Sequence, residues 1–177
     1  MTEKKSTNAL ADDHYDQDDN TQKDRYLTFH LASEDFGLEI RFVTEIVGIQ
    51  KITKIPDLPE FVRGVINLRG KLIPVMDVRL RFNLPPREFD NRTCIIVVEI
   101  KDSSVGLVVD EVREVLSIPA AQVEPPPTTS KGRGNRYIKG IGKTDEEVKI
   151  LLDAQQLLLE EDLELIGSSL MMENHGQ

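Results

Sequence analysis

The chain has 177 residues, of which 39% are hydrophobic and 30% charged, values typical of a globular protein. Its net charge of −9 argues against a nucleic-acid partner and against binding to anionic membranes. The single cysteine excludes an internal disulfide framework and cysteine-based zinc sites, and no apolar run approaches the length of a membrane span.

The first 25 residues carry seven acidic and four basic side chains and almost no large apolar ones. Such a segment cannot bury enough apolar surface to fold, so residues 1–25 are predicted to be a disordered acidic tail. Asp16 and Asp18 have the alternate spacing of a calcium loop, but Thr21 stands where that loop needs glycine. The segment also lacks the hydrophobic core of a secretion signal, which favours a cytoplasmic protein.

Strand signals follow the tail. Residues 26–31 (YLTFHL) are rich in strand-forming types. The next segment alternates apolar and polar residues, which places four side chains on one face of a strand: Phe36, Leu38, Ile40 and Phe42. The spacing then changes, because Val43, Ile46 and Val47 fall at i, i+3 and i+4. This pattern predicts about one turn of helix.

Residues 63–77 (RGVINLRGKLIPVMD) are predicted to form two short strands around a tight turn at Arg69 and Gly70. Gly64 and Gly70 are expected at positions that need unusual backbone dihedral angles. Pro74 has no N–H to donate to a ladder, so its strand is expected to be an edge strand or to be bulged there.

The second half of the chain repeats this order. Residues 83–91 are a predicted linker, 94–100 and 104–112 a second pair of strands, and 123–136 a loop rich in proline and glycine. A late strand at residues 147–153 precedes a predicted C-terminal helix, whose leucines are spaced three and four apart. Residues 167–177 are predicted to be a C-terminal tail.

The two halves align with each other. Residues 36–49 match residues 105–118 at an offset of 69, with identical glycine, leucine, valine, glutamate and isoleucine at five positions. Residues 63–77 match residues 139–153 at an offset of 76, with Gly64 on Gly140. Two copies in the same order indicate one structural unit used twice.

The repeat predicts an all-β fold of two small antiparallel barrels, with a first repeat at about 26–84 and a second at about 92–158 within a single domain, 26–166. Whether strands exchange between the two barrels is left open. Each copy of about 60 residues would bury only a marginal core, so the barrels are expected to pack on each other through an apolar seam.

Catalytic and cofactor chemistry finds little support. The Gly-Lys-Thr sequence at 142–144 is reminiscent of a phosphate-binding loop, but Tyr137 replaces a required glycine and a turn and strand follow instead of a helix. His14, His30 and His175 are scattered and suggest no metal site or catalytic pairing. We therefore predict a protein that is not an enzyme and binds no cofactor or metal.

Charged and apolar residues at turns are the remaining candidates. Arg69, at the tip of its turn, is either a solvated charge or a protein-contact residue, since arginine is favoured at interfaces for its planar donor fork. Glu45 lies beside Val43, and Val43 is either a contact or a core residue. A binder of a small ligand or nucleotide at the seam of two barrels is the alternative function from another class.

Three motifs carry a family resemblance: FGLEIRFVTEIV at 36–47, RGVINLRGKLIPVMD at 63–77 and VGLVVDEVREVLSI at 105–118. Over about residues 24–166 the chain closely resembles the CheW-like domain family of bacterial chemotaxis coupling proteins. The resemblance implies two tandem five-stranded Src-homology-3-like β-barrels with a C-terminal helix. It also implies a stand-alone, non-enzymatic adaptor that joins the histidine kinase CheA to the cytoplasmic tips of methyl-accepting chemoreceptors, in arrays at the membrane but without insertion into it.

The resemblance also assigns contact positions. Those implied for the receptor surface are Val43, Glu45, Arg69, Cys94, Gly106 and Val115, although many relatives carry an aliphatic residue in place of Cys94. For a patch facing the regulatory domain of the kinase, Ile40 and Val65 are predicted, with burial in the core of the monomer as an equal alternative. The acidic tail and the loop around SKGRGN depart from the family pattern.

Overall fold

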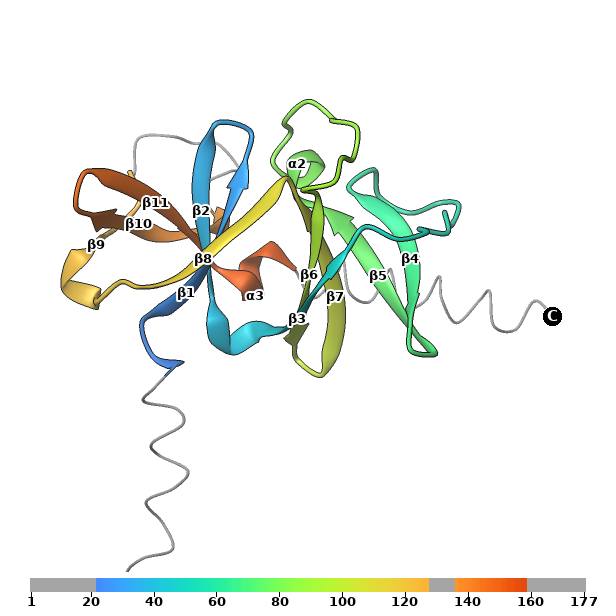
Figure 1. Ribbon diagram of the computed structural model, residues 1–177, viewed down its shortest axis with the longest axis horizontal. Coiled ribbons are helices and arrows are strands. Elements are labelled where there is room, and N and C mark those ends of the chain that lie inside the picture. Colours follow the sequence, from blue (N-terminus) through green and yellow to red (C-terminus); the bar gives the residue numbers. More distant parts are fainter. Residues whose placement is uncertain (1–21, 128–135, 159–177) are drawn as a thin grey trace, which may run out of the picture.

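The computed structural model describes residues 22–127 and 136–158, which form two β-sheets lying side by side (Figure 1). Sheet 1 has the strand order β8 (Glu111–Ser117), β1 (Arg25–Leu31), β2 (Glu34–Glu39), β11 (Glu147–Leu152), β10 (Ile138–Thr144) and β9 (Val123–Glu124). Sheet 2 has the order β3 (Val43–Gly48), β6 (Cys94–Ile100), β7 (Ser103–Val109), β5 (Lys71–Asp77) and β4 (Val62–Leu68). The predicted all-β, Src-homology-3-like class is confirmed, with the short β9 as a sixth strand in sheet 1.

Each sheet combines strands from both copies of the repeat. The first two strands of one copy, β1 and β2, lie with the last three of the other, β8, β10 and β11. Sheet 2 has the converse composition, with β6 and β7 beside β3, β4 and β5. A single residue, Asp110, separates β7 from β8, which is too short for a turn back onto the same sheet, so the chain runs straight on into the neighbouring sheet.

The main core lies between the two sheets. On β1, Leu27 and Phe29 face this core, and on β6 Ile96 and Val98 do the same. Alternate residues on β6 point the other way, into a smaller core enclosed by sheet 2, and sheet 1 encloses a similar small core around Ile118. The predicted apolar seam is therefore confirmed, and the continuous apolar run of β6 is explained by burial on both of its faces.

The predicted helical turn at residues 43–47 is wrong in position. A single 3-10 turn, η1 (Ile40–Phe42), comes earlier, and Val43 begins strand β3. A register shift between Val43 and Glu45 marks a bulge in the pairing of β3 with β6. Because a bulge moves the residues after it to the opposite face, a strand can carry the apolar spacing of a helix.

The turn between β4 and β5 has the predicted two residues, Arg69 and Gly70, both with positive φ (53° and 85°). This is the backbone of a type I′ turn, which suits the twist of paired strands. Gly64 has φ of 143°, as its predicted role requires. β5 is not an edge strand, because it lies between β4 and β7; Pro74 precedes the residues that pair with β7, so its missing N–H is outside that ladder.

Two short helices follow equivalent strands of the two copies. Asp77 caps α2 (Val78–Arg81) and Asp153 caps α3 (Ala154–Leu157), each by accepting two backbone N–H bonds. A second 3-10 turn is η2 (Ala120–Gln122). Of the predicted C-terminal helix, α3 ends at Leu157, and the part beyond residue 158 lies outside the described residues. So do residues 1–21 of the tail predicted at 1–25, the tail at 167–177 and most of the predicted 123–136 loop. Arg25, predicted as the last residue of the tail, begins β1 instead.

No helix in the described parts of the chain is long and apolar enough to cross a membrane.

Candidate functional site

Glu45 and Arg69 form an exposed ion pair at the side of sheet 2. Glu45 comes from β3 and Arg69 from the tip of the β4–β5 turn, and an Arg69 guanidinium N–H donates to a Glu45 carboxylate oxygen. The Arg69 side chain is 72% exposed and the Glu45 side chain 28%. The hydrogen bond and the charge of Glu45 raise the pKa of Arg69 above its usual value. Water screens the charges of a pair this exposed, so the ion pair contributes little to the free energy of folding. The arginine therefore remains able to reach a partner.

An apolar strip runs along the edge of the seam between β3 and β8. Ile46 on β3 lies opposite Ile96, and Val115 on β8 lies opposite Leu27, so both point toward the seam. Yet Ile46 is 44% exposed and Val115 is 39% exposed, because β3 and β8 are the edge strands of their sheets. Together with the half-buried side chains beside them, they form the seam strip: Ile40, Val43, Ile46, Val112 and Val115.

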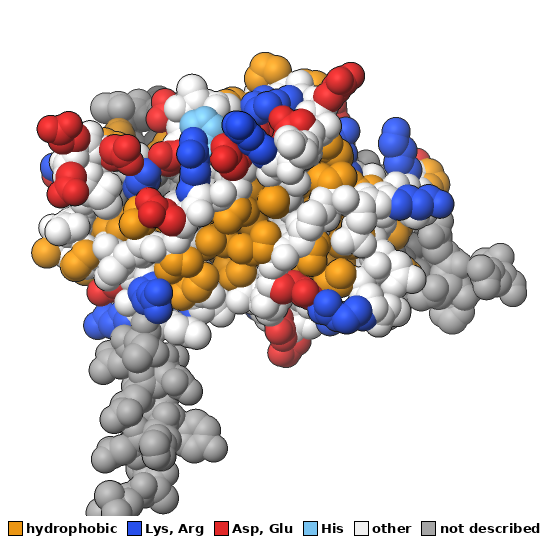
Figure 2. Space-filling model, viewed as in Figure 1, with side chains coloured by type: hydrophobic (Ala, Val, Ile, Leu, Met, Phe, Trp, Pro, Cys, Tyr) orange, Lys and Arg blue, Asp and Glu red, His pale blue; other side chains and the backbone are white. Residues whose placement is uncertain are grey.

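Figure 2 shows apolar side chains gathered in the middle of this face, between the strands β8 and β3 that Figure 1 places there. Charged side chains lie around this patch. An apolar centre with a charged rim is the usual arrangement of a protein-contact surface.

Sequence reasoning missed two members of the seam strip, Ile46 and Val112. The offset of 69 could have found both, because it places Ile46 on Val115 and Val43 on Val112. The predicted contact residues Val43 and Val115 thus each have a counterpart on the opposite edge strand. The helical assignment of residues 43–47 hid this, since it did not identify Val43–Gly48 as an edge strand equivalent to β8.

The other predicted contact residues lie in different surroundings. Cys94 is partly exposed at the start of β6, and its thiol donates to the Arg92 carbonyl at 3.3 Å. Gly106 is buried in β7, where an added Cβ would lie 2.7 Å from the Ile95 side chain, so this glycine permits close packing.

The two residues predicted for the kinase surface also differ from each other. Val65 is only 6% exposed, which favours its core alternative. Ile40 is half-buried against the main core and remains accessible within the seam strip.

The structure brings Glu45 and Arg69 into contact and places Val43 two residues from Glu45 on β3, while Val115 belongs to the other sheet.

The structure gives the Gly-Lys-Thr segment no phosphate-loop geometry. It ends strand β10, a turn follows, and Lys143 pairs with Glu124 of β9. Over residues 22–127 and 136–158, no group of three or more histidine, cysteine, aspartate or glutamate side chains is placed to hold a metal ion.

Comparison with known proteins agrees with this geometry. Residues 25–162 match the family model described as a CheW-like domain. A chemotaxis protein CheW from Klebsiella aerogenes is 36% identical over 143 residues, covering 81% of this chain and 86% of the relative. One from Thermotoga maritima is 32% identical over 136 residues, covering 76% and 87%.

The fold is also found in a solved structure. The crystal structure of the scaffolding protein TtCheW from Thermoanaerobacter tengcongensis superposes with a TM-score of 0.72 at 40% identity, covering 78% of this chain and 94% of that one. The repeat, the two sheets and the matches over most of the folded region lead to one conclusion: this chain belongs to the CheW-like domain family of chemotaxis scaffold proteins.

Proposed function

We propose that this chain is a non-enzymatic adaptor that couples chemoreceptors to the histidine kinase CheA in arrays beneath the membrane. The observation that carries the proposal is the exposed seam strip beside the Glu45–Arg69 pair. Ile46 and Val115 are apolar yet exposed, and the ion pair is open to water; both features are typical of surfaces that another protein covers. The family to which the chain belongs supports a scaffold role.

The receptor is assigned to the surface around Arg69. A long arginine on a turn can reach a helical partner while Glu45 holds it in place, and Val43 and Val115 supply the apolar contact. Cys94 extends this surface along β6, and Gly106 supports it from below by close strand packing. Asp145 occupies the position of Arg69 in the second copy, so the fold does not require arginine there.

The kinase regulatory domain is assigned to a patch that includes Ile40. This side chain lies on η1, where the chain crosses from sheet 1 to sheet 2, so a partner bound there would contact both sheets. Val65 is left out of the kinase patch because its side chain is buried.

The test titrates a soluble receptor fragment and the isolated kinase regulatory domain separately against wild type and Arg69→Ala, by calorimetry. Arg69→Ala should fold normally but bind the receptor fragment more weakly by roughly 1–3 kcal/mol, the range of an interface arginine. Its affinity for the kinase domain should change much less. Asp145→Ala, at the equivalent turn of the second copy, is the matched control and should leave both affinities unchanged.

Unchanged receptor affinity in a folded Arg69→Ala protein would return this arginine to the role of a solvated charge. For the kinase patch, Ile40→Asp should keep the circular dichroism of wild type and lose affinity for the kinase domain. An unfolded Ile40→Asp protein would instead assign this side chain to the core.

A further inference from the structure

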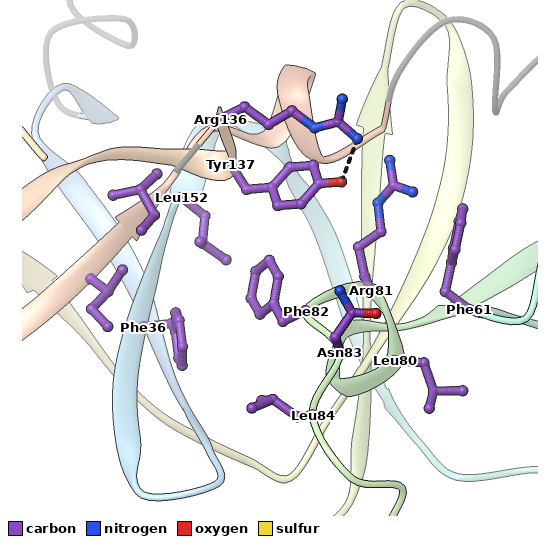
Figure 3. Close-up of a pocket in the computed structure, with 12 residues that line it drawn as sticks. Phe36, Phe61, Leu80, Arg81, Phe82, Asn83, Leu84, Arg136, Tyr137 and Leu152 are labelled. Carbon is purple, nitrogen blue, oxygen red and sulfur yellow. Dashed lines mark hydrogen bonds between the residues drawn. The ribbon is translucent and has the colours of Figure 1, made fainter. Parts of the chain in front are cut away.

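A cavity of about 530 Å³ lies at the seam, lined by residues associated with both sheets. One wall comes from β2, β10 and β11 of sheet 1, and the other from α2 and the residues around it, which flank strands of sheet 2 (Figure 3). The seam strip contributes none of the residues that line it. A side chain that enters this cavity would therefore contact segments of both sheets.

Most side chains that line the cavity are apolar, and several are aromatic. The Phe36 and Phe82 ring centroids are 5.7 Å apart, and those of Phe82 and Tyr137 are also 5.7 Å apart. Figure 3 shows these three rings arranged around the cavity, with Phe61 across from them. All four rings belong to the main core or pack against it, so the cavity continues that core toward the surface. An apolar group that covers such a wall removes it from water, which is favourable.

The last described residues of the chain lie in this same core. The Asp153 N–H, just before α3, donates to the carbonyl of Tyr137, a cavity residue, at 2.8 Å. At the other end of α3, Leu157 and Leu158 are 1% and 3% exposed within the main core. Leu158 has φ of −115° and ψ of 85°, outside the helical region, so the chain leaves the helix there. Residue 159 therefore starts from the core that the cavity continues.

The next residues have a sequence that suits such a cavity. Leu159, Leu163 and Ile166 are spaced by four and by three, which places apolar side chains on one side of helical turns. The residues between them include four acidic ones: Glu160, Glu161, Asp162 and Glu164. A short amphipathic segment of this kind gains most of its stability from covering its apolar side with another part of the protein.

The charge of this segment complements one edge of the cavity. The described residues that line the cavity include no aspartate or glutamate. Arg136 is exposed at this edge and donates to the Tyr137 hydroxyl at 2.9 Å, and no carboxylate of residues 22–127 or 136–158 pairs with it. In a chain with a net charge of −9, an edge of this kind attracts an acidic segment that much of the remaining surface repels.

The first copy of the repeat shows how a segment after the equivalent helix covers the core. Leu84 follows α2 and packs against the main core, and the chain turns back at Asn83, whose φ is 59°. At the offset of 76 their counterparts are Leu159 and Glu160. Leucine is unfavourable at a positive φ, and glutamate is unfavourable against an apolar core. The second copy therefore needs a later apolar residue for this role, and the next one is Leu163.

We propose that residues 159–166 of this chain bind in the cavity. Leu163 and Ile166 lie against the rings of Phe61 and Phe82, and the acidic side chains lie toward Arg136. Because the walls come from segments of both sheets, the bound segment fastens the sheets together across the seam. The contact is made within one chain and away from the seam strip, so the proposal does not depend on the adaptor role.

The direct test is NMR spectroscopy of the full wild-type chain with labelled leucine and isoleucine methyl groups. Nuclear Overhauser effects should connect the methyl groups of Leu163 and Ile166 with ring protons of Phe61 and Phe82. A mixed sample of two differently labelled chains separates contacts within one chain from contacts between chains. Absence of these effects would overturn the proposal. Effects found only between chains would also overturn it, because they would assign the cavity to a second copy.

A pair of single substitutions tests which side of the segment faces the cavity. Leu163→Ser should shift the amide resonances of Phe82 and Ile150 and lower the melting temperature by roughly 4–8 °C, as expected when a covered leucine is lost from a chain of this size. Leu165→Ser, in the same segment but outside the apolar spacing, is the matched control and should do neither. Equal effects of the two substitutions, or no effect of Leu163→Ser, would contradict the proposed contact.

Discussion

Asp110 is the residue at which the chain crosses from β7 to β8, and it is held by several hydrogen bonds. Arg79 donates to it from Nε at 2.8 Å and from Nη2 at 2.7 Å, and the Ala32 N–H donates at 3.0 Å. Burial by itself would raise the pKa of Asp110, but these bonds and the charges of Arg79 and Arg87 outweigh it and lower the pKa below its usual value. The crossing is thus fixed by an ionised carboxylate.

This arrangement predicts how stability depends on pH. An aspartate whose pKa is lower in the folded state stabilises the fold fully above its unfolded pKa of about 3.9. This stabilisation is lost as the pH falls through the lower pKa of the folded state, because the carboxylate is then protonated in the folded and the unfolded protein alike. In urea denaturation, the contribution of Asp110 to the unfolding free energy should therefore be fully present at pH 7. It should begin to fall below about pH 4 and be lost once the pH is below the pKa of Asp110 in the folded state.

Asp110→Asn should remove this contribution. At pH 7 its unfolding free energy should be lower by about 3 kcal/mol, because the mostly buried Arg79 loses its counter-charge. The gap between variant and wild type should narrow as the pH falls. Glu124→Gln, at an exposed pair with Lys143, is the control and should change stability little. A gap that stays constant down to pH 2 would show that the charge of Asp110 is not what stabilises the crossing.

Some individual residues of the candidate site could be predicted from sequence patterns and others could not. Arg69 was recognisable because the β4–β5 turn is encoded locally, by a two-residue turn ending in glycine. Local spacing did not reveal Ile46 and Val112, although the repeat offset relates them to Val115 and Val43, because their exposure depends on which strands lie at the sheet edges. That is set by pairing with residues far away in the chain, which local spacing does not report.

Among the elements, β4 is bent where Gly64 lies, and this allows the chain to run close to Thr53. The Thr53 N–H and C=O both bond to Val65, forming an isolated bridge that β9 and β10 reproduce in the second copy. An added Cβ on Gly64 would lie 2.0 Å from the Thr53 carbonyl oxygen, and the φ of 143° is itself unfavourable for any other residue.

Gly64→Ala should therefore cost roughly 3 kcal/mol or more of unfolding free energy, through strain and clash together. Gly48→Ala is the matched control on a nearby strand, since no atom lies within 4 Å of its added Cβ. Its stability should be unchanged or higher by up to about 1 kcal/mol. Thermal denaturation of both variants measures the contrast, and similar melting temperatures would contradict the role assigned to Gly64.

The bulge in β3 shows where element prediction from sequence stops. The turn, the glycines and the alternating strands were predictable, because each depends on neighbours in the chain. The strand identity of Val43–Gly48 was not, since its apolar spacing is helical and only the ladder with β6 makes it a strand.

For the whole molecule, the repeat predicted two similar barrels and left open whether they exchange strands. Each sheet needs strands from both copies, so we propose that residues 26–158 unfold as one cooperative unit. Fragments ending at 91 and starting at 92 should each lack native tertiary structure, and mixing them should restore it. A native-like near-ultraviolet circular dichroism spectrum from either fragment alone would contradict this.

The exchange of strands also bears on how the protein is made. β1 pairs with β8, so Arg25 must wait for Ser117, roughly 90 residues later, which takes about 5–20 s at common ribosomal rates. Until then, both edges of the N-terminal β1–β2 hairpin are unpaired, since β2 waits even longer for β11, and its apolar face is uncovered. Such surfaces are the kind on which nascent chains aggregate or recruit chaperones. An architecture that makes the finished scaffold indivisible thus leaves its first half unprotected during translation.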